Sequence, residues 1–512
     1  AAVDGGTLAI GNAAALGTST VTVATGATLD LAGLDVTGAT LLLNGGAIAN
    51  ATAYSGSVGF AAGITSFGAA DLTGLAANVE VRVAAGQTLN TTGLTRGIDF
   101  RGGSLANLGS YAGVLDVRGD LDATATGLST GAINLTSAGN ITLGNTASAA
   151  AINYQGGSLS GANFTGDLNI VGAVTVAGVV SAGTFKVDAG DTLTLGVNGV
   201  SANIKLLGGT VDFGGRTSTS SVAYSSGTIA NGANFTGDVS YVGSLNLAKD
   251  AFGAGQILVA AGNTANFGAG FANRVSYSGG TIQNGANYAG TLTVNSGATL
   301  DAATNLAGSI VLNTGAQLAG VGSVGAVTAK DGSQISTGAS TPGLLTTAGL
   351  RLEAGSTLVV NMKDATAARG VGFDSVTVAG LLDLSALSAA SRVTLQLKSL
   401  DANGLTGNLA VQSFAWNDPK SFTLFSYGTL NLGAGVSISD VFSIDYSGFK
   451  DENGNVARAD WFTISNDTGA GAIVLTAIPE PSTYGLAIGA LALAAAALRR
   501  RRKQKAADAS AQ

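Results

Sequence analysis

A short motif that recurs five times is the feature that most limits how this chain of 512 residues can fold. Each copy joins a Gly-containing turn to a Leu or Ile, and it ends in an aromatic residue that is followed two positions later by Gly. The final aromatic residues are Tyr54, Tyr111, Phe164, Phe235 and Tyr288. Their separations of 57, 53, 71 and 53 residues are close to three or four multiples of about 18, which predicts a structural unit of that length.

A second element, Gly-x-Thr-Leu, recurs between the copies of the motif. It occupies residues 26–29, 86–89, 190–193, 297–300 and 355–358. Thr and Leu alternate in this element, as on a strand with one buried face. Short strands joined by Gly and Asn turns form coils, and each coil covers the open edge of its neighbour. The sequence therefore predicts an all-β fold, a right-handed β-solenoid (β-helix).

The composition fits an elongated β-protein better than a set of compact enzyme domains. The chain has 78 glycines, 46% apolar residues, only 6% aromatic residues and 11% charged residues. Burial is therefore achievable, and the core is predicted to consist of Val, Leu, Ile and Ala in narrow layers. Only four prolines interrupt the hydrogen bonding of the backbone.

The absence of Cys and His from the sequence excludes several kinds of chemistry. Disulfides, thiolate metal sites, Ser-His-Asp triads and His-ligated zinc all need one of these residues. The acidic residues occur mostly singly, as do Asp30, Asp167, Asp191, Asp238 and Asp301. We therefore expect a non-enzymatic protein without catalytic residues, cofactor or metal. A β-helix polysaccharide lyase or hydrolase that acts through carboxylates is the less favoured alternative.

Two groups of residues allow both a functional and a structural interpretation. The motif aromatics are either platforms for sugar stacking or an inward ladder between coils, and the alternation with Gly and β-branched residues favours the ladder. Asn at the turns, as at Asn163, is interpreted as turn chemistry or a stacked amide ladder in preference to a ligand. The segment Asp451-Glu452-Asn453-Gly454-Asn455 has oxygen ligands at alternate positions, which suggests calcium. A hairpin turn at Asn453-Gly454 is preferred because the spacing of a calcium loop is incomplete.

The repeats resemble the autotransporter-associated β-strand repeats of bacterial passenger domains over residues 1–345. The segments 339–345 and 352–358 resemble the region that closes such a passenger. From residue 346 to 477 the periodicity loosens and larger aromatic residues gather, which predicts a C-terminal capping β-region that protects the last edge. These aromatic residues include Trp416, Phe422, Phe425, Tyr427, Phe442, Tyr446, Phe449, Trp461 and Phe462.

The last segment, residues 478–512, combines three features in a fixed order. Pro479, Glu480, Pro481, Ser482 and Thr483 come first, and the two prolines favour an extended backbone around Glu480. An uncharged stretch from Tyr484 to Leu498 follows; as a helix it would measure about 22 Å, short of the ~30 Å hydrocarbon core. The basic residues Arg499, Arg500, Arg501, Arg502 and Lys503 follow it. Their long side chains can snorkel, which predicts a single short transmembrane helix with a cytoplasmic tail.

These three parts resemble the PEP-CTERM sorting signal of Gram-negative bacteria that produce exopolysaccharide. The resemblance implies that an exosortase, a membrane enzyme, recognises this segment and cleaves near Pro479-Glu480-Pro481. It also implies export, a transient anchor in the inner membrane, and a final place on the outer cell surface or in the extracellular biofilm matrix. The chain begins with Ala1-Ala2-Val3-Asp4, so we expect that a signal peptide has been removed or that the sequence is truncated.

The charge of the body argues against nucleic acid as a partner. Six of the 24 basic residues lie beyond Leu498, whereas 30 of the 31 acidic residues precede that point. A body with 18 basic and 30 acidic residues lacks the cationic face that nucleic acid requires. The favoured function is a structural protein of the cell surface or of the exopolysaccharide matrix, with exopolysaccharide itself as a further partner. A glycan-binding surface adhesin is the alternative.

Overall fold

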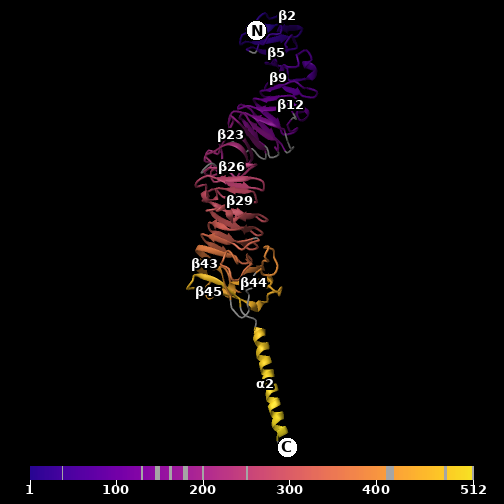
Figure 1. The fold of residues 1–512 in the computed structure, drawn as a ribbon. Helices are drawn as coiled ribbons and strands as arrows, with labels where there is room; N and C mark the ends of the chain where they lie inside the picture. The colour runs from indigo at the N-terminus through magenta and orange to yellow at the C-terminus, as the bar shows by residue number, and fades with distance from the viewer. Residues whose placement is uncertain are drawn as a thin grey trace. The chain divides into compact units, whose positions relative to one another are not determined.

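The computed structural model describes residues 1–36, 38–128, 131–144, 150–160, 164–176, 183–198, 201–248, 252–338, 340–410, 420–477 and 481–509, with the side chains of 481–488 and 504–509 left out. The chain forms an all-β solenoid of about 18 turns, which confirms the predicted fold class. It divides into two compact units, unit 1 (Ala1–Val242 and Asp250–Leu258) and unit 2 (Gly243–Lys249 and Val259–Gln512). Figure 1 shows the coils of each unit following one another in chain order.

The first face of unit 1 is built from parallel strands that are each contributed by a successive coil. They are β1 (Ala2–Val3), β3 (Thr20–Ala24), β5 (Thr40–Asn44), β7 (Ser57–Phe60), β9 (Glu80–Val83), β11 (Ile98–Phe100), β13 (Leu115–Val117), β15 (Ile133–Leu135), β17 (Ile152–Tyr154), β19 (Asp167–Ile170), β21 (Thr184–Asp188), β23 (Asn203–Asp212), β24 (Ser221–Ala230), β25 (Asp238–Tyr241) and β27 (Gln256–Val259). Val81 pairs with Ile98, and Ile98 with Leu115. Both steps are 17 residues long, close to the predicted 18.

A second face of unit 1 consists of shorter groups of parallel strands. They are β2 (Gly6–Ala9), β4 (Ala27–Asp30) and β6 (Ala47–Ala49); β8 (Ser66–Gly68), β10 (Thr88–Asn90) and β12 (Ser104–Ala106); β14 (Asp120–Ala123), β16 (Asn140–Leu143) and β18 (Ser158–Ser160); and β20 (Ala173–Val176) and β22 (Thr192–Leu195), which continue into β23. In β4 and β6, Leu29 pairs with Ile48. The Gly-x-Thr-Leu element of one coil therefore stacks on the motif of the next coil.

Unit 2 repeats this arrangement. Its parallel strands are β26 (Ser244–Leu247), β28 (Thr264–Phe267) and β30 (Thr281–Gln283); β29 (Val275–Tyr277), β31 (Thr291–Val294), β33 (Ser309–Leu312), β36 (Val327–Ala329), β39 (Leu350–Leu352), β41 (Ser375–Leu384) and β43 (Lys420–Leu432); β35 (Gly322–Val324) and β38 (Leu344–Thr347); and β32 (Thr299–Asp301), β34 (Gln317–Ala319), β37 (Gln334–Ser336), β40 (Thr357–Met362), β42 (Val393–Ser399) and β44 (Phe442–Gly448). Parallel pairing thus continues well past residue 345, and the predicted boundary between residues 345 and 346 stays a prediction.

Antiparallel strands close the solenoid at its C-terminal end. The first half of β43 pairs with β46 (Ala472–Ala477), which pairs in turn with β45 (Phe462–Asp467). The short helix α1 (Ile438–Val441) precedes β44. Most of the large aromatic residues predicted for this region are buried here, including Phe422, Phe425, Phe442, Phe449, Trp461 and Phe462. Trp416 lies outside the described residues.

Single turns of 3-10 helix form some of the corners between strands. They are η1 (Ala69–Leu72), η2 (Leu108–Ser110), η3 (Gly285–Asn287), η4 (Ala302–Thr304) and η5 (Ala459–Trp461). In η2 and η3 the residue before the turn is an Asn in the left-handed region, Asn107 at φ +62° and Asn284 at φ +54°. Asn tolerates this conformation better than most residues, because its short polar side chain can bond locally.

The core is a stack of small aliphatic layers, as the composition predicts. Alternate residues of strands such as β9, β13 and β15 point inward. Val81, Ile98, Leu115 and Ile133 are fully buried and lie one above another. Burying a side chain of this size contributes about 1.5–3 kcal/mol. The Leu residues of the Gly-x-Thr-Leu element, such as Leu89, are buried in the same way. Backbone bonding between coils and aliphatic stacking therefore stabilise the same register.

The final aromatic residue of every motif copy points into this core. Tyr54, Tyr111, Phe164, Phe235 and Tyr288 are each at most 1% exposed. The Tyr111 hydroxyl lies within hydrogen-bond distance of the backbone carbonyls of Arg96 (2.6 Å) and Val114 (2.8 Å), so its single donor has an acceptor. The inward orientation that was predicted for these rings is confirmed, and they are not available for sugar stacking.

The motif glycines are required by close backbone contacts between coils. Gly156 and Gly157 have φ of +133° and +77°, a region that residues with a side chain rarely adopt. A Cβ at Gly157 would also overlap the carbonyl oxygen of Gly139 in the preceding coil. These glycines let the chain turn sharply between the two faces.

Candidate functional site

The last three residues of the predicted sorting motif begin a long C-terminal helix. The helix α2 (Pro481–Ala509) begins at the second proline of the motif. Proline suits the first helical position, because its ring fixes φ and its missing N–H has no intrahelical partner there. Pro479 and Glu480 lie outside the described residues. Ser482 and Thr483 belong to the first turn of α2, and only their backbone is described.

The basic residues predicted to set the topology lie on α2. Arg499, Arg500, Arg501, Arg502 and Lys503 are all exposed. The preceding turns present Leu491, Leu493 and Leu498, which are 61–74% exposed. The helix therefore carries apolar side chains followed directly by cationic ones.

Among the helices that the structure describes, none combines the length and the apolar character needed to cross a membrane.

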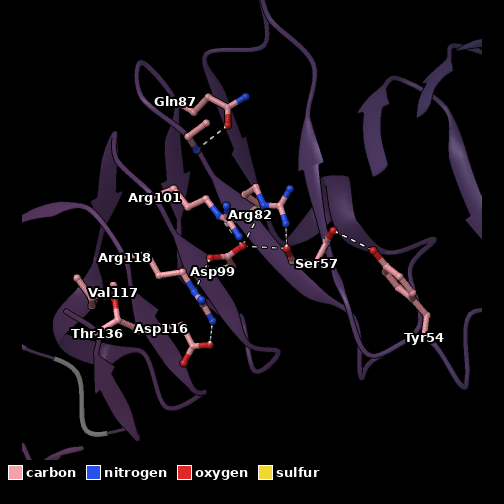
Figure 2. A network of polar contacts seen from close by, with 11 residues as sticks. Tyr54, Ser57, Arg82, Gln87, Asp99, Arg101, Asp116, Val117, Arg118 and Thr136 are labelled. Carbon is pink, nitrogen blue, oxygen red and sulfur yellow. Dashed lines mark hydrogen bonds and ion pairs between the residues drawn. The ribbon is translucent and has the colours of Figure 1, made fainter. Parts of the chain in front are cut away.

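A connected cluster of polar side chains in unit 1 lies on the outer side of β9, β11 and β13 and is centred on Asp99 (Figure 2). Oδ2 of Asp99 accepts hydrogen bonds from Ser57 Oγ, Arg82 Nε and Arg101 Nε, each at 2.9 Å. Oδ1 of Asp99 lies 3.2 Å from Arg118 Nε. The Asp99 side chain is only 4% exposed, so one buried carboxylate holds three guanidinium groups from three successive coils.

The electrostatics of this Asp99 cluster follow from its geometry. Burial alone would raise the pKa of Asp99, but hydrogen bonds from Arg82, Arg101 and Ser57 outweigh it and hold that pKa below its ordinary value. Nearby Glu80 shows the opposite shift, because burial first, and then the charges of Asp116 and Asp99, raise its pKa. Asp99 is therefore the permanent anion of the cluster.

A row of polar side chains continues from the cluster along the outer face. Asn134 Nδ2 donates to Asp116 Oδ1 (2.6 Å), Asn153 Nδ2 to Asn134 Oδ1 (2.8 Å), and Asn169 Nδ2 to Asn153 Oδ1 (3.2 Å). These residues occupy the same register position in successive strands from β13 to β19. The outer polar row is thus Arg82, Asp99, Asp116, Asn134, Asn153 and Asn169.

Sequence reasoning missed the Asp99 cluster, although a signal for it exists. The segments Ile98-Asp99-Phe100-Arg101-Gly102 and Leu115-Asp116-Val117-Arg118-Gly119 share the pattern apolar-Asp-apolar-Arg-Gly at a spacing of 17 residues. One coil also takes about 17 residues here, so the same pattern places Asp next to Asp and Arg next to Arg. These acidic residues are isolated along the sequence, but the stacking of coils makes them neighbours in space.

Most other acidic residues shape corners of the coils. The side chains of Asp30, Asp122, Asp212 and Asp301 each accept the backbone N–H two residues later, at 2.7–2.9 Å. This is the bond of an Asx turn, which orders the backbone after a strand. These carboxylates act as structural acceptors, and Asp30 and Asp301 are two of the acids that occur singly in the sequence.

The Asp451 segment forms a turn of the predicted kind. Oδ1 of Asp451 accepts the backbone N–H groups of Asn453 (2.9 Å) and Asn455 (2.7 Å), and Gly454 has φ +84°. Asp451 is fully buried by its own loop. Over the described residues, no three acidic side chains converge in a group that could hold a metal ion.

The fold and the C-terminal segment together define the class: a β-solenoid protein with a sorting motif at its C-terminal end. Residues 477–502 match the family model of the PEP-CTERM protein-sorting motif. No curated protein matches the chain. The motif implies an exported protein that an exosortase processes and that carries a C-terminal membrane anchor. The detailed resemblance to autotransporter repeats stays a prediction.

Proposed function

We propose that this exported chain is a non-enzymatic structural component of the outer cell surface or of the exopolysaccharide matrix. In this proposal the solenoid itself is the functional part, because it presents a long polar face on a stable stack of coils. Exosortase cleavage near the Pro-Glu-Pro segment separates the solenoid from its anchor. The observation that carries the proposal is the use of acidic side chains as structural acceptors.

Two contacts illustrate this use. Asp212 accepts the backbone N–H of Gly214 at 2.7 Å, as a corner residue. Asp374 is 1% exposed, and its oxygens accept the N–H groups of Gly343 (2.7 Å) and Asn361 (2.9 Å). A carboxylate that hydrolyses a glycosidic bond needs access to substrate and a second carboxylate about 5–10 Å away. Burial denies Asp374 this access, and both carboxylates are occupied by backbone N–H groups, which supports a non-enzymatic role.

A cleavage screen tests the proposal. The purified full chain is incubated with acidic and neutral polysaccharides, and new reducing ends and unsaturated ends are measured. We expect no release above that of a heat-denatured sample. Release that persists through purification and disappears in one Asp→Asn or Glu→Gln variant would identify an enzyme and overturn the proposal.

A further inference from the structure

Arg101 and Arg118 occupy the same position in two successive coils. The backbone N–H of Arg101 donates to the carbonyl of Val83 (2.8 Å), and that of Arg118 to the carbonyl of Phe100 (2.7 Å). Neighbouring parallel strands lie about 4.8 Å apart, so the two side chains leave the sheet side by side. Two adjacent cations repel each other unless an anion lies between them. Asp99 supplies that anion from beneath.

Arg101 is held by a hydrogen bond to Asp99, and Arg118 by an ion pair with the same carboxylate. Arg101 Nε and Arg118 Nε contact the two different oxygens of the Asp99 carboxylate, at 2.9 Å and 3.2 Å. The side chains remain 49% and 45% exposed. Among the described residues, the Nη1 and Nη2 atoms of Arg101 have no hydrogen-bond partner, and Arg118 uses one Nη for a 3.4 Å contact to Asp116. The guanidinium groups of Arg101 and Arg118 therefore hold defined positions, and their unused N–H groups face outward.

The local charge favours an anion at this position. Asp99 with Arg82, Arg101 and Arg118 carries a net charge of +2, and Asp116 reduces it to +1. Glu80 also lies near the cluster, where burial raises its pKa, and its carboxylate brings the sum to zero. The arginines nevertheless carry the outward charge, because Arg101 and Arg118 are 49% and 45% exposed, whereas Asp99 and Asp116 are 4% and 15% exposed. The rest of the body is acidic, with 18 basic and 30 acidic residues before the tail. The Arg101–Arg118 pair is thus a cationic site on an anionic surface.

We propose that Arg101 and Arg118 form a binding site for the anionic groups of an acidic polysaccharide. Planar guanidinium groups bind carboxylates and sulfates through paired hydrogen bonds, which makes arginine better suited than lysine to this task. Asp99 positions both forks before the ligand arrives, so little side-chain entropy is lost on binding. The outer polar row continues from Asp116 to Asn169 with amide groups that suit sugar hydroxyls. This site adds a ligand to the proposed structural role and does not depend on it.

A binding assay with the full chain in a non-ionic detergent tests the site. Every protein in the series also carries R499Q, R500Q, R501Q and R502Q, because the tail arginines would bind polyanions as well. The ligands are oligogalacturonate, which carries carboxylates, sulfated dextran, which carries sulfates, and neutral dextran. We expect binding of at least one acidic ligand, weakening as salt is raised, and no binding of neutral dextran. The acidic ligand that binds identifies the anionic group that the site recognises, a carboxylate or a sulfate.

Three substitutions separate the site from general charge. Arg101→Gln should weaken binding at least tenfold, whereas Arg101→Lys, which keeps the charge but loses the fork, should weaken it less. Arg216→Gln is the matched control, because Arg216 is an exposed arginine of unit 1 outside the cluster, and it should leave binding unchanged. Thermal melting checks that each variant folds. If R101Q does not fold, the comparison of R101K with the parent protein tests the proposal alone. No binding of either acidic ligand, or an equal effect of the Arg101 and Arg216 variants, would overturn the proposal.

Discussion

Asn231 donates its side-chain amide to the carboxylate of Asp212, which lies one coil earlier, at a distance of 2.8 Å. The same Oδ1 atom of Asp212 accepts the backbone N–H of Gly214. Asn231 itself has φ +49°. One side chain therefore meets two needs: it tolerates a left-handed backbone at the corner, and it ties that corner to the coil beneath. Asn50 bonds Asp30 in the same way.

We expect Asn231→Ala to destabilise this corner by about 2–3 kcal/mol. Of this, roughly 1–2 kcal/mol comes from placing Ala in the left-handed region and roughly 1 kcal/mol from the lost hydrogen bond. Asn231→Gly should cost less, because Gly adopts positive φ freely. Hydrogen exchange of peptides covering β23 and β24 measures the effect locally. Equal protection in the two variants would show that backbone conformation is not the reason for Asn at this position.

We expect Gly237→Ala to destabilise unit 1 by roughly 1–3 kcal/mol through overpacking. A Cβ at Gly237 would overlap the carbonyl oxygen of Ser220 and lie 2.8 Å from the Phe235 ring. Gly74→Ala is the matched control, because an added Cβ there has no neighbour within 4 Å and the backbone is not in the left-handed region. Urea denaturation should shift for the first variant and stay near the wild type for the second. A small shift for Gly237→Ala would mean that the backbone at Ser220 and the Phe235 ring both move away from the added Cβ at little cost.

Asp374 predicts a pH dependence of stability. Burial raises the pKa of Asp374 to about 6, although N–H groups of Asn361 and Gly343 and the Thr337 side chain offset part of the shift. In the unfolded chain its pKa is about 3.9. As the pH rises from about 4 to 6, the unfolded chain releases this proton before the folded one does. The folded state therefore loses stability over this window, by an amount on the order of 3 kcal/mol.

Asp374→Asn isolates this contribution, because Asn stays neutral at every pH and is close in shape to the protonated acid. Relative to this variant, the wild type should be less stable at pH 7 than at pH 4. Urea denaturation of both proteins at both pH values gives the difference, and other carboxylates cancel in the comparison. A difference that does not change with pH would mean that the hydrogen bonds keep the carboxyl at its ordinary pKa.

Processing at the sorting motif is the fourth expectation. In a host with an exosortase, we expect the mature protein to lack Tyr484 to Gln512, whereas Glu480→Ala or deletion of Arg499 to Lys503 should leave precursor in the inner membrane. The control variant Asp4→Ala, which removes an acidic residue outside the motif, should be processed normally. Mass spectrometry of the surface fraction decides the outcome. An intact C-terminal peptide containing Gln512 in that fraction would show that the segment is a permanent anchor.

The sequence predicted the solenoid because its signals are local and repeated. The spacing of Tyr54, Tyr111 and Phe164 predicted the coil length, and alternation in the Gly-x-Thr-Leu element predicted the buried face. Each motif copy and each alternating element is a short run of neighbouring residues, so both can be recognised without knowing which residues stack between coils. The predicted right-handed sense of the coil stays a prediction.

The Asp99 cluster was not predicted, because it depends on which residues stack between coils. Arg82, Asp99 and Arg118 are separated by 17 and 19 positions in the chain, and a shift of one residue in register would point them to the opposite face. The register became certain only from the pairing of β9, β11 and β13. For the same reason the link between Asn231 and Asp212 could not be seen in either segment alone.

The stepwise pairing of Leu115 with Ile133 has a consequence for how such a chain can change its length. Removing the 18 residues from Asp116 to Ile133 would bring Asn134 directly after Leu115, and every later side chain would keep its inward or outward direction. Removing half as many residues would instead join a strand of one face directly to a strand of the other face. Gene duplications and deletions that survive are therefore expected to add or subtract whole coils, so that chains of this kind differ in discrete steps.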